Sequence, residues 1–172
     1  DRSRRKSAVG GCSHEQVEFT EFADGANPAL SVVRYSGNTR PPQKDRSNLG
    51  QELRVNRQLF KHGMGVHAPC SIMYAIKPNY ERFVALAGAN ENLVRISNGS
   101  NLAKYPSIRF KIFIDGKEMA SSPVMRILSM AWRFNVPIPK GAKHISLVAM
   151  DAGDGSREDF ADWVNAGFVF NK

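Results

Sequence analysis

The fold class is decided by one stretch of sequence, Ile108-Arg109-Phe110-Lys111-Ile112-Phe113-Ile114-Asp115-Gly116. Every second side chain from Ile108 to Ile114 is large and apolar, and Arg109 and Lys111 lie between them. Successive side chains of a strand point to opposite faces, so this pattern predicts a strand with one face in a core. Asp-Gly is typical of a two-residue hairpin turn, which predicts a returning strand over residues 117–120.

Short runs of the same character recur along the chain, bounded by Gly, Pro, Asn or Asp. They cover residues 17–19, 30–35, 51–59, 71–76, 82–87, 134–137, 144–150 and 163–170. No longer stretch keeps the period of an amphipathic helix. We therefore predict an all-β protein, a two-sheet antiparallel β-sandwich.

The length of 172 residues suits one domain with a sizeable core. Apolar residues make up 42% and charged residues 23%, which is ordinary for a globular protein, and no apolar run is long enough to span a membrane. Residues 1–14 are basic and then glycine-rich, which predicts a flexible linker before a single domain at 15–172. This opening has no signal peptide and indicates the cut edge of a larger multidomain protein.

The net charge of +8 raises the question of nucleic-acid binding. The basic residues are spread over the N-terminal residues and from Arg34 to Lys61, and no helix gathers them on one face. The sequence also lacks the glycine and aromatic pattern of an RNA-binding sheet. We interpret the charge as a solvated basic surface, with nucleic acid as a disfavoured partner.

The two cysteines, Cys12 and Cys70, are too few for a disulfide scaffold. Cys70 lies in an apolar setting, which predicts a buried free thiol. A Cys12–Cys70 bridge is the alternative in an oxidising compartment.

Gly-Met-Gly-Val-His-Ala-Pro at residues 63–69 is the first motif that a plain strand does not need. Its glycines allow tight turning or close approach by another segment. His67 follows them, and it is either a structural hydrogen-bonding residue or a ligand contact. A zinc site is not predicted, because the histidines show no ligand spacing with the two cysteines.

The second motif, Asp-Ala-Gly-Asp-Gly-Ser-Arg-Glu-Asp-Phe-Ala-Asp-Trp, covers residues 151–163. Calcium takes oxygen ligands, and Asp151, Asp154 and Asp159 offer them. The same side chains could instead cap the amides of a glycine-containing turn. Paired carboxylates also serve as general acid and base in glycosidases. We rank the structural and calcium interpretations ahead of catalysis.

The strand that follows this loop is expected to place Asp162 and Trp163 on opposite faces. If Val164 and Phe168 face the core, Asp162 starts the same inward row. A buried carboxylate must be hydrogen-bonded or metal-bound because an unpaired buried charge is very costly, so Asp162 is a candidate metal ligand with Asp151 and Asp154. Trp163 then points outward, where it either packs under a loop or forms a platform for the apolar face of a sugar ring.

In these motifs the chain resembles the NPCBM domain, a family of carbohydrate-binding modules. The resemblance rests on residues 63–69, on the strand, turn and strand at 108–119, and on 151–155 with 159–163. It implies a jelly-roll sandwich of the galactose-binding-domain type. It also implies a non-catalytic module attached to secreted bacterial glycoside hydrolases or other extracellular proteins.

The resemblance further implies a ligand and a site. Galactose-type or related sugars are the expected ligands, and the module would target a larger extracellular protein to glycans. Structural calcium is the expected cofactor, because folds of this type often carry one. The expected ligand-binding residues are His67, Asn90, Glu91, Asp159 and Trp163.

Three positions depart from the family pattern. Phe160 stands where the family often has histidine, Asn90-Glu91-Asn92 replaces a more acidic stretch, and Cys70 replaces a serine. The first two departures favour a second hypothesis, a protein-interaction or structural sandwich that has lost sugar binding. A third hypothesis, an enzyme that uses the aspartate cluster, ranks below both.

Overall fold

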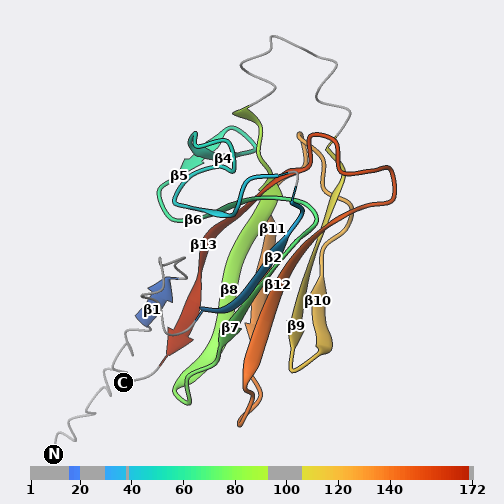
Figure 1. The fold of residues 1–172 in the computed structure, drawn as a ribbon. Helices are drawn as coiled ribbons and strands as arrows, with labels where there is room; N and C mark the ends of the chain where they lie inside the picture. The colour runs from blue at the N-terminus through green and yellow to red at the C-terminus, as the bar shows by residue number, and fades with distance from the viewer. Residues whose placement is uncertain (1–15, 20–29, 38, 93–105, 171–172) are drawn as a thin grey trace, which may run out of the picture.

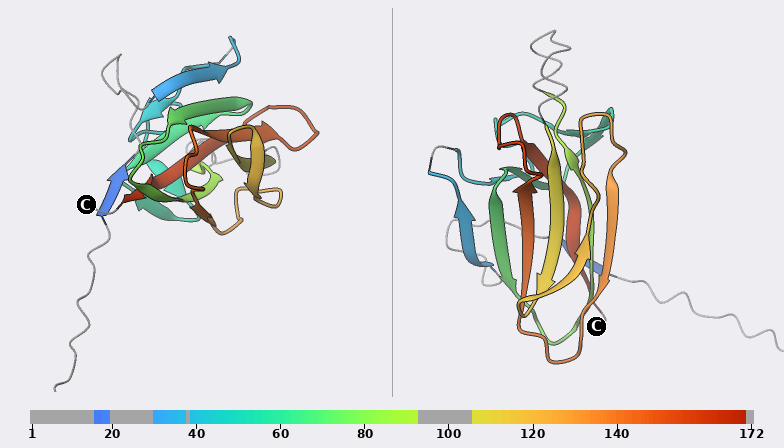
Figure 2. Two further views of the ribbon diagram at one scale, coloured as in Figure 1. Left: turned by 90° about the horizontal axis from the view of Figure 1, so that it is seen from below. Right: turned by 90° about the vertical axis from the view of Figure 1, so that its right-hand side faces the viewer.

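The structure is a computed structural model that describes residues 16–19, 30–37, 39–92 and 106–170. Two antiparallel sheets and a short hairpin make up this part of the chain (Figure 1). In the side view of Figure 2, the strands of both sheets run along one long axis. The predicted all-β sandwich is therefore confirmed. Among the described residues, no helix is long and apolar enough to cross a membrane.

The six-stranded sheet has five strands in one path, and a sixth strand pairs with its middle strand. In order the five are β11 (Trp132–Pro137), β8 (Tyr80–Ala89), β13 (Phe160–Phe170), β6 (Gly63–His67) and β3 (Gln43–Lys44), and the sixth is β1 (Gln16–Phe19). The five-stranded sheet has the order β10 (Lys117–Ser121), β9 (Ile108–Ile114), β12 (His144–Asp151), β7 (Cys70–Ala75) and β2 (Leu30–Tyr35).

Strand β9 has the predicted alternation and forms part of the main core between the sheets. Ile108, Phe110 and Ile112 are fully buried, whereas Arg109 is exposed. Asp115 and Gly116 both have positive φ, 48° and 79°, as a two-residue hairpin turn requires. The turn returns the chain into β10, so this predicted hairpin is confirmed.

The run predicted as one strand at residues 51–59 is instead a hairpin of β4 (Leu53–Val55) and β5 (Gln58–Phe60). Asn56 and Arg57 at its turn both have positive φ, 45° and 68°. Leu53 and Val55 pack against Val164 of β13 and form a second small core on the outer side of the six-stranded sheet. The hairpin approaches β8 so closely that a Cβ on Gly88 would lie 2.3 Å from Val55 Cγ1.

The outward orientation predicted for Trp163 is wrong, because a bulge in β13 changes the alternation. The pairing with β8 shifts between Val164 and Gly167, and Asn165 in this interval has a positive φ of 49°. Before the bulge, Trp163 faces the main core and Val164 faces the small core; after it, Phe168 returns to the main core. Counting in twos back from Phe168 therefore inverts the face of Trp163.

Cys70 is buried and free, as predicted, and burial raises the pKa of its thiol to about 12. Cys12 and the linker predicted at residues 1–14 lie outside the described residues.

Candidate functional site

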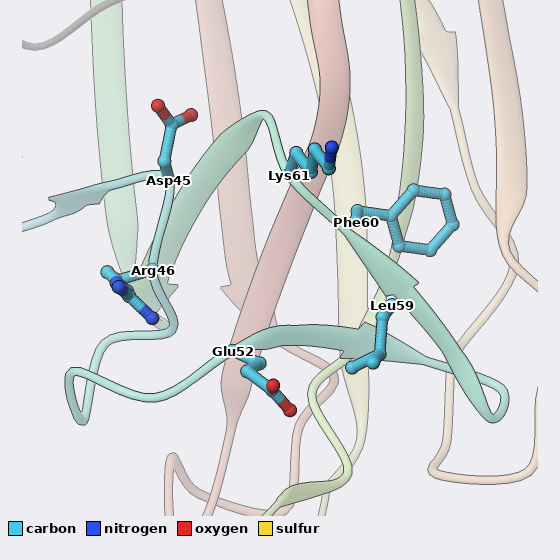
Figure 3. A pocket seen from close by; sticks show the side chains of 6 residues that line it. All are labelled: Asp45, Arg46, Glu52, Leu59, Phe60 and Lys61. Atoms are coloured by element: carbon cyan, nitrogen blue, oxygen red, sulfur yellow. The ribbon is translucent and has the colours of Figure 1, made fainter.

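The β4–β5 hairpin forms one wall of a cavity of about 470 Å³ (Figure 3). Its lining side chains come from the loop after β3, from the residue before β4, and from β5 and the residue after it: Asp45, Arg46, Glu52, Leu59, Phe60 and Lys61. Leu59 is 55% exposed, so it presents an apolar surface to the cavity. Phe60 is half-buried and packs against the small core, so it fixes this wall to the sheet.

The charged side chains of the cavity are of two kinds. Asp45 is anchored, because its Oδ1 accepts a hydrogen bond of 3.0 Å from the Gly63 amide. Arg46, Glu52 and Lys61 make no side-chain hydrogen bond or ion pair with the described residues. They are exposed and can therefore donate to, or accept from, a bound polar molecule.

Residues at the end of β8 hold the hairpin from behind. The Asn90 and Asn92 side-chain amides both donate to the Glu52 carbonyl, at 3.2 and 2.5 Å. Glu91 Oε1 accepts hydrogen bonds from Arg54 Nε at 2.9 Å and from the Arg57 amide at 2.5 Å. Asn90 and Glu91, predicted to touch ligand, are thus buried behind the hairpin and position the wall of the cavity.

Asp162 lies fully buried between the hairpin and the six-stranded sheet. Its Oδ2 accepts hydrogen bonds from Asn90 Nδ2 at 2.6 Å and from the Arg54 amide at 3.2 Å. Its Oδ1 has no hydrogen-bond partner among the described residues. Burial raises the pKa of this carboxyl to about 8, against the two hydrogen bonds that lower it. The predicted hydrogen-bonded inward carboxyl is therefore present.

A cluster of three carboxylates lies in the loop between β12 and β13. Asp151, Asp154 and Asp159 each place one oxygen within 4.8 Å of the others. The structure thus joins Asp159, and not the predicted Asp162, to Asp151 and Asp154. Figure 1 shows this loop at the same end of the sandwich as the β4–β5 hairpin.

Asp159 gives this cluster a buried, incompletely bonded oxygen. Its Oδ1 accepts a 2.9 Å hydrogen bond from the Ser107 amide, while its Oδ2 has no partner among the described residues. Burial raises the pKa of Asp159 to about 7, and the charges of Asp154 and Asp151 add to this effect. Three carboxylates that each offer an oxygen, one of them buried and with a partnerless oxygen, match the preference of a hard divalent cation. The cluster can therefore hold a metal ion.

The other two carboxylates of the cluster organise the loop. The Ser107 hydroxyl donates to Asp154 Oδ1, and this hydrogen bond lowers the pKa of Asp154. Asp151 Oδ1 accepts from the amides of Gly153 at 2.9 Å and Asp154 at 3.1 Å. The loop-capping interpretation is therefore also correct for Asp151.

His67 ends β6 at this same end of the sandwich. Its Nδ1 lies 2.8 Å from the Ala68 carbonyl, which can only accept, so Nδ1 carries a proton. Burial lowers the pKa of the imidazole. The Phe160 ring packs edge-on against it, with 4.8 Å between the ring centroids. His67 does not line the cavity at the hairpin.

Trp163 offers no surface to a sugar. Its side chain is 0% exposed, and its ring packs between those of Phe110 and Phe134, with ring-centroid distances of 5.0 and 5.6 Å. The sugar platform predicted on it is therefore replaced by a role in the core. Trp132, the other tryptophan, is 40% exposed.

The sequence does not predict this cavity. Its lining residues carry no recognisable motif, and their proximity depends on the docking of a hairpin against β13 and β8. The one available signal was Leu59, an apolar residue whose neighbours at alternate spacing, Arg57 and Lys61, are both charged.

Comparison with known proteins gives a consistent picture. The family description "NPCBM/NEW2 domain" matches residues 26–169. Alpha-1,3-galactosidase B of Akkermansia muciniphila is 29% identical over 139 residues, which is 80% of this chain and 16% of that protein. A protein of Renibacterium salmoninarum is 27% identical over 135 residues, 75% of this chain and 8% of its own length. The chain thus spans less than a fifth of either curated relative.

Two solved structures extend the comparison. The CBM51-2 and INT domains of Clostridium perfringens ZmpB, solved in complex with GlcNAc, are 27% identical with a TM-score of 0.72, over 82% of this chain and 30% of that one. The CBM51 of Clostridium perfringens GH95, in complex with methyl-galactose, is 23% identical with a TM-score of 0.68, over 81% and 93% of the two chains. The second likeness shows a shared fold.

Proposed function

Because the chain belongs to the NPCBM/NEW2 domain family, we propose that it is a non-catalytic carbohydrate-binding module for galactose-type or N-acetylglucosamine-type sugars. The main support for this class of ligand is the similarity, at 27% identity and a TM-score of 0.72, to domains solved in complex with GlcNAc. The name of the Akkermansia relative, a galactosidase, supports galactose-type glycans as the wider class.

We propose the cavity beside the β4–β5 hairpin as the sugar site. Its volume of about 470 Å³ suits a mono- or disaccharide. Leu59 offers an exposed apolar surface for one face of the ring, as amphipathic sugars require. Arg46, Glu52 and Lys61 have hydrogen-bonding groups free for hydroxyls. Asn90, Glu91 and Asp162 would then contribute by holding this wall in place.

Catalysis is assigned to other parts of a larger bacterial, extracellular protein. The chain matches only 16% of the Akkermansia galactosidase, so most of that enzyme lies outside the shared region. A tethered module raises the effective concentration of its enzyme at a glycan without adding chemistry.

We also propose Ca²⁺ as the cation of the carboxylate cluster. Asp151, Asp154 and the free Oδ2 of Asp159 would hold it, and its two positive charges would offset most of the negative charge of the three carboxylates. Through the two hydrogen bonds of Ser107, the cation would stabilise the contact between this loop and the start of β9.

Titration calorimetry with galactose, N-acetylgalactosamine and GlcNAc tests the function, and Leu59→Asp and Lys61→Ala test the site. Both variants should retain their melting temperature and lose most of the affinity. Lys140→Ala, an exposed charge change in the loop between β11 and β12, is the control and should bind normally. Unchanged binding by the two cavity variants would exclude this site. Binding of no glycan by the folded wild type would favour the protein-interaction alternative.

A further inference from the structure

Arg126 lies next to the carboxylate cluster because the preceding residue, Met125, forms an antiparallel bridge with Ile108 at the start of β9. Met125 and Ile108 exchange two backbone hydrogen bonds, of 3.0 and 2.7 Å. On its other side, Ile108 pairs with Asp151 of β12. In an antiparallel arrangement, the residue after Met125 lies beside the residue before Ile108, so Arg126 lies beside Ser107.

Ser107 is the residue that binds two members of the cluster. Its amide donates to Asp159 and its hydroxyl donates to Asp154. The Arg126 backbone is fixed on the far side as well, since its amide donates to Ser129 Oγ at 2.9 Å and its carbonyl accepts from the Ser129 amide at 3.0 Å. The Arg126 backbone is therefore held beside Ser107, from where its long side chain can extend toward the carboxylates.

The guanidinium is not committed to another carboxylate. Arg126 is exposed, and it forms no ion pair within the described part of the chain. Its charge nevertheless acts on the cluster. The largest effect on the pKa of Asp154 is the Ser107 hydrogen bond, which lowers it, and the largest effect on the pKa of Asp159 is burial, which raises it. The positive charge of Arg126 adds a smaller effect that lowers the pKa of both carboxyls.

A positive charge near three carboxylates has two opposite consequences. Without a metal ion it offsets part of the repulsion among the carboxylates. With a divalent cation in place, the same positive charge repels that cation. We propose that Arg126 sets the affinity of the cation site, because it stabilises the metal-free loop and weakens cation binding.

This inference rests on the proposed cation, and its test uses Ca²⁺ alone as the probe. Melting temperatures are measured with chelator and with excess Ca²⁺, and Ca²⁺ affinity is measured by calorimetry. Arg126→Gln should melt lower than wild type in chelator, and it should bind Ca²⁺ about tenfold more tightly because a like charge is gone. Arg126→Lys should resemble wild type, since it keeps the charge.

Arg133→Gln is the matched control, an exposed arginine on β11 with no role in the cluster. It should change neither quantity. Equal Ca²⁺ affinity in wild type and Arg126→Gln would overturn the inference, as would equal melting in chelator. Sugar titrations on the same proteins distinguish failure of the Arg126 proposal from failure of the proposed sugar-binding function. Absence of Ca²⁺ binding with intact sugar binding would remove the cation and this inference while leaving the proposed function in place.

Discussion

The side-chain amide of Asn90 donates a 2.6 Å hydrogen bond to the buried carboxyl of Asp162, 72 positions away in the sequence. The same Asp162 oxygen accepts from the Arg54 amide of β4. These two bonds join β8, β13 and the hairpin at one point beneath the small core. The position of the cavity wall therefore depends on a buried acid.

Replacing Asp162 tests the effect of that acid on stability. Its pKa is raised to about 8 in the folded state, against about 4 for an unfolded aspartate. The folded chain thus keeps a proton that the unfolded chain loses. From about pH 4 to pH 8, Asp162 makes the folded state less stable as the pH rises, by at most about 1.4 kcal/mol per pH unit, and above pH 8 its effect is constant.

Asp162→Asn should therefore melt with a shallower pH dependence and should be more stable than wild type at pH 8. The measurement is thermal unfolding from pH 4.5 to pH 9. Asp159, whose pKa is raised to about 7, acts in the same direction and leaves a residual slope in the variant. Parallel curves for the two proteins would show that Asp162 is ionised in the folded state.

Glu91 should control the hairpin without touching the ligand. Its side chain is 9% exposed, and Glu91→Ala removes hydrogen bonds to Arg54 and Arg57, at a cost of about 1–3 kcal/mol. Sugar affinity should fall while the fold persists. Glu118→Ala breaks the more exposed Lys111–Glu118 pair and is the control, with an expected cost of at most about 1 kcal/mol. Equal losses in stability and affinity for the two variants would contradict the assignment.

The sequence predicted the architecture better than the site, for a physical reason. Strand β9 alternates without interruption, so its period alone gives the buried face, and Asp115-Gly116 gives the turn. The acidic loop was also recognised, and Asp151 and Asp154 do lie together. These features depend on residues close in sequence.

The predictions for individual site residues failed where contacts between distant segments determine the position of a side chain. One residue in a left-handed conformation, Asn165, inverts the face of Trp163, and its amide bonds to the His62 carbonyl of another segment. The pairing of Asn90 with Asp162 is likewise tertiary, and so is the folding that brings Leu59 and Asp45 to one cavity. The motifs carrying the family resemblance turn out to brace the fold internally, whereas the cavity is lined by residues without a motif.

Truncation should destabilise the protein much more at Trp163 than at Trp132. Trp163→Ala removes a ring that is 0% exposed and should cost about 3–5 kcal/mol in urea unfolding. Trp132→Ala removes a 40% exposed ring and should cost clearly less. Trp163→Phe fills most of the volume and should recover part of the loss. A larger loss for Trp132 than for Trp163 would contradict the burial assigned to β13.

Gly65 should be intolerant of any side chain, although its φ is not positive. A Cβ there would lie 2.2 Å from the Arg46 carbonyl oxygen and 2.4 Å from Ser47 Cα, and both are backbone atoms that cannot rotate away. Gly65→Ala should therefore displace the segment that brings Asp45 and Arg46 to the cavity. We expect a loss of about 1–3 kcal/mol, the usual cost of overpacking, together with loss of sugar binding. Gly37→Ala is the matched control because nothing lies within 4 Å of its Cβ. If both Gly65→Ala and Gly37→Ala keep full sugar affinity, the segment at Asp45 does not form the sugar site. The cavity beside the hairpin is then not the place where the sugar binds.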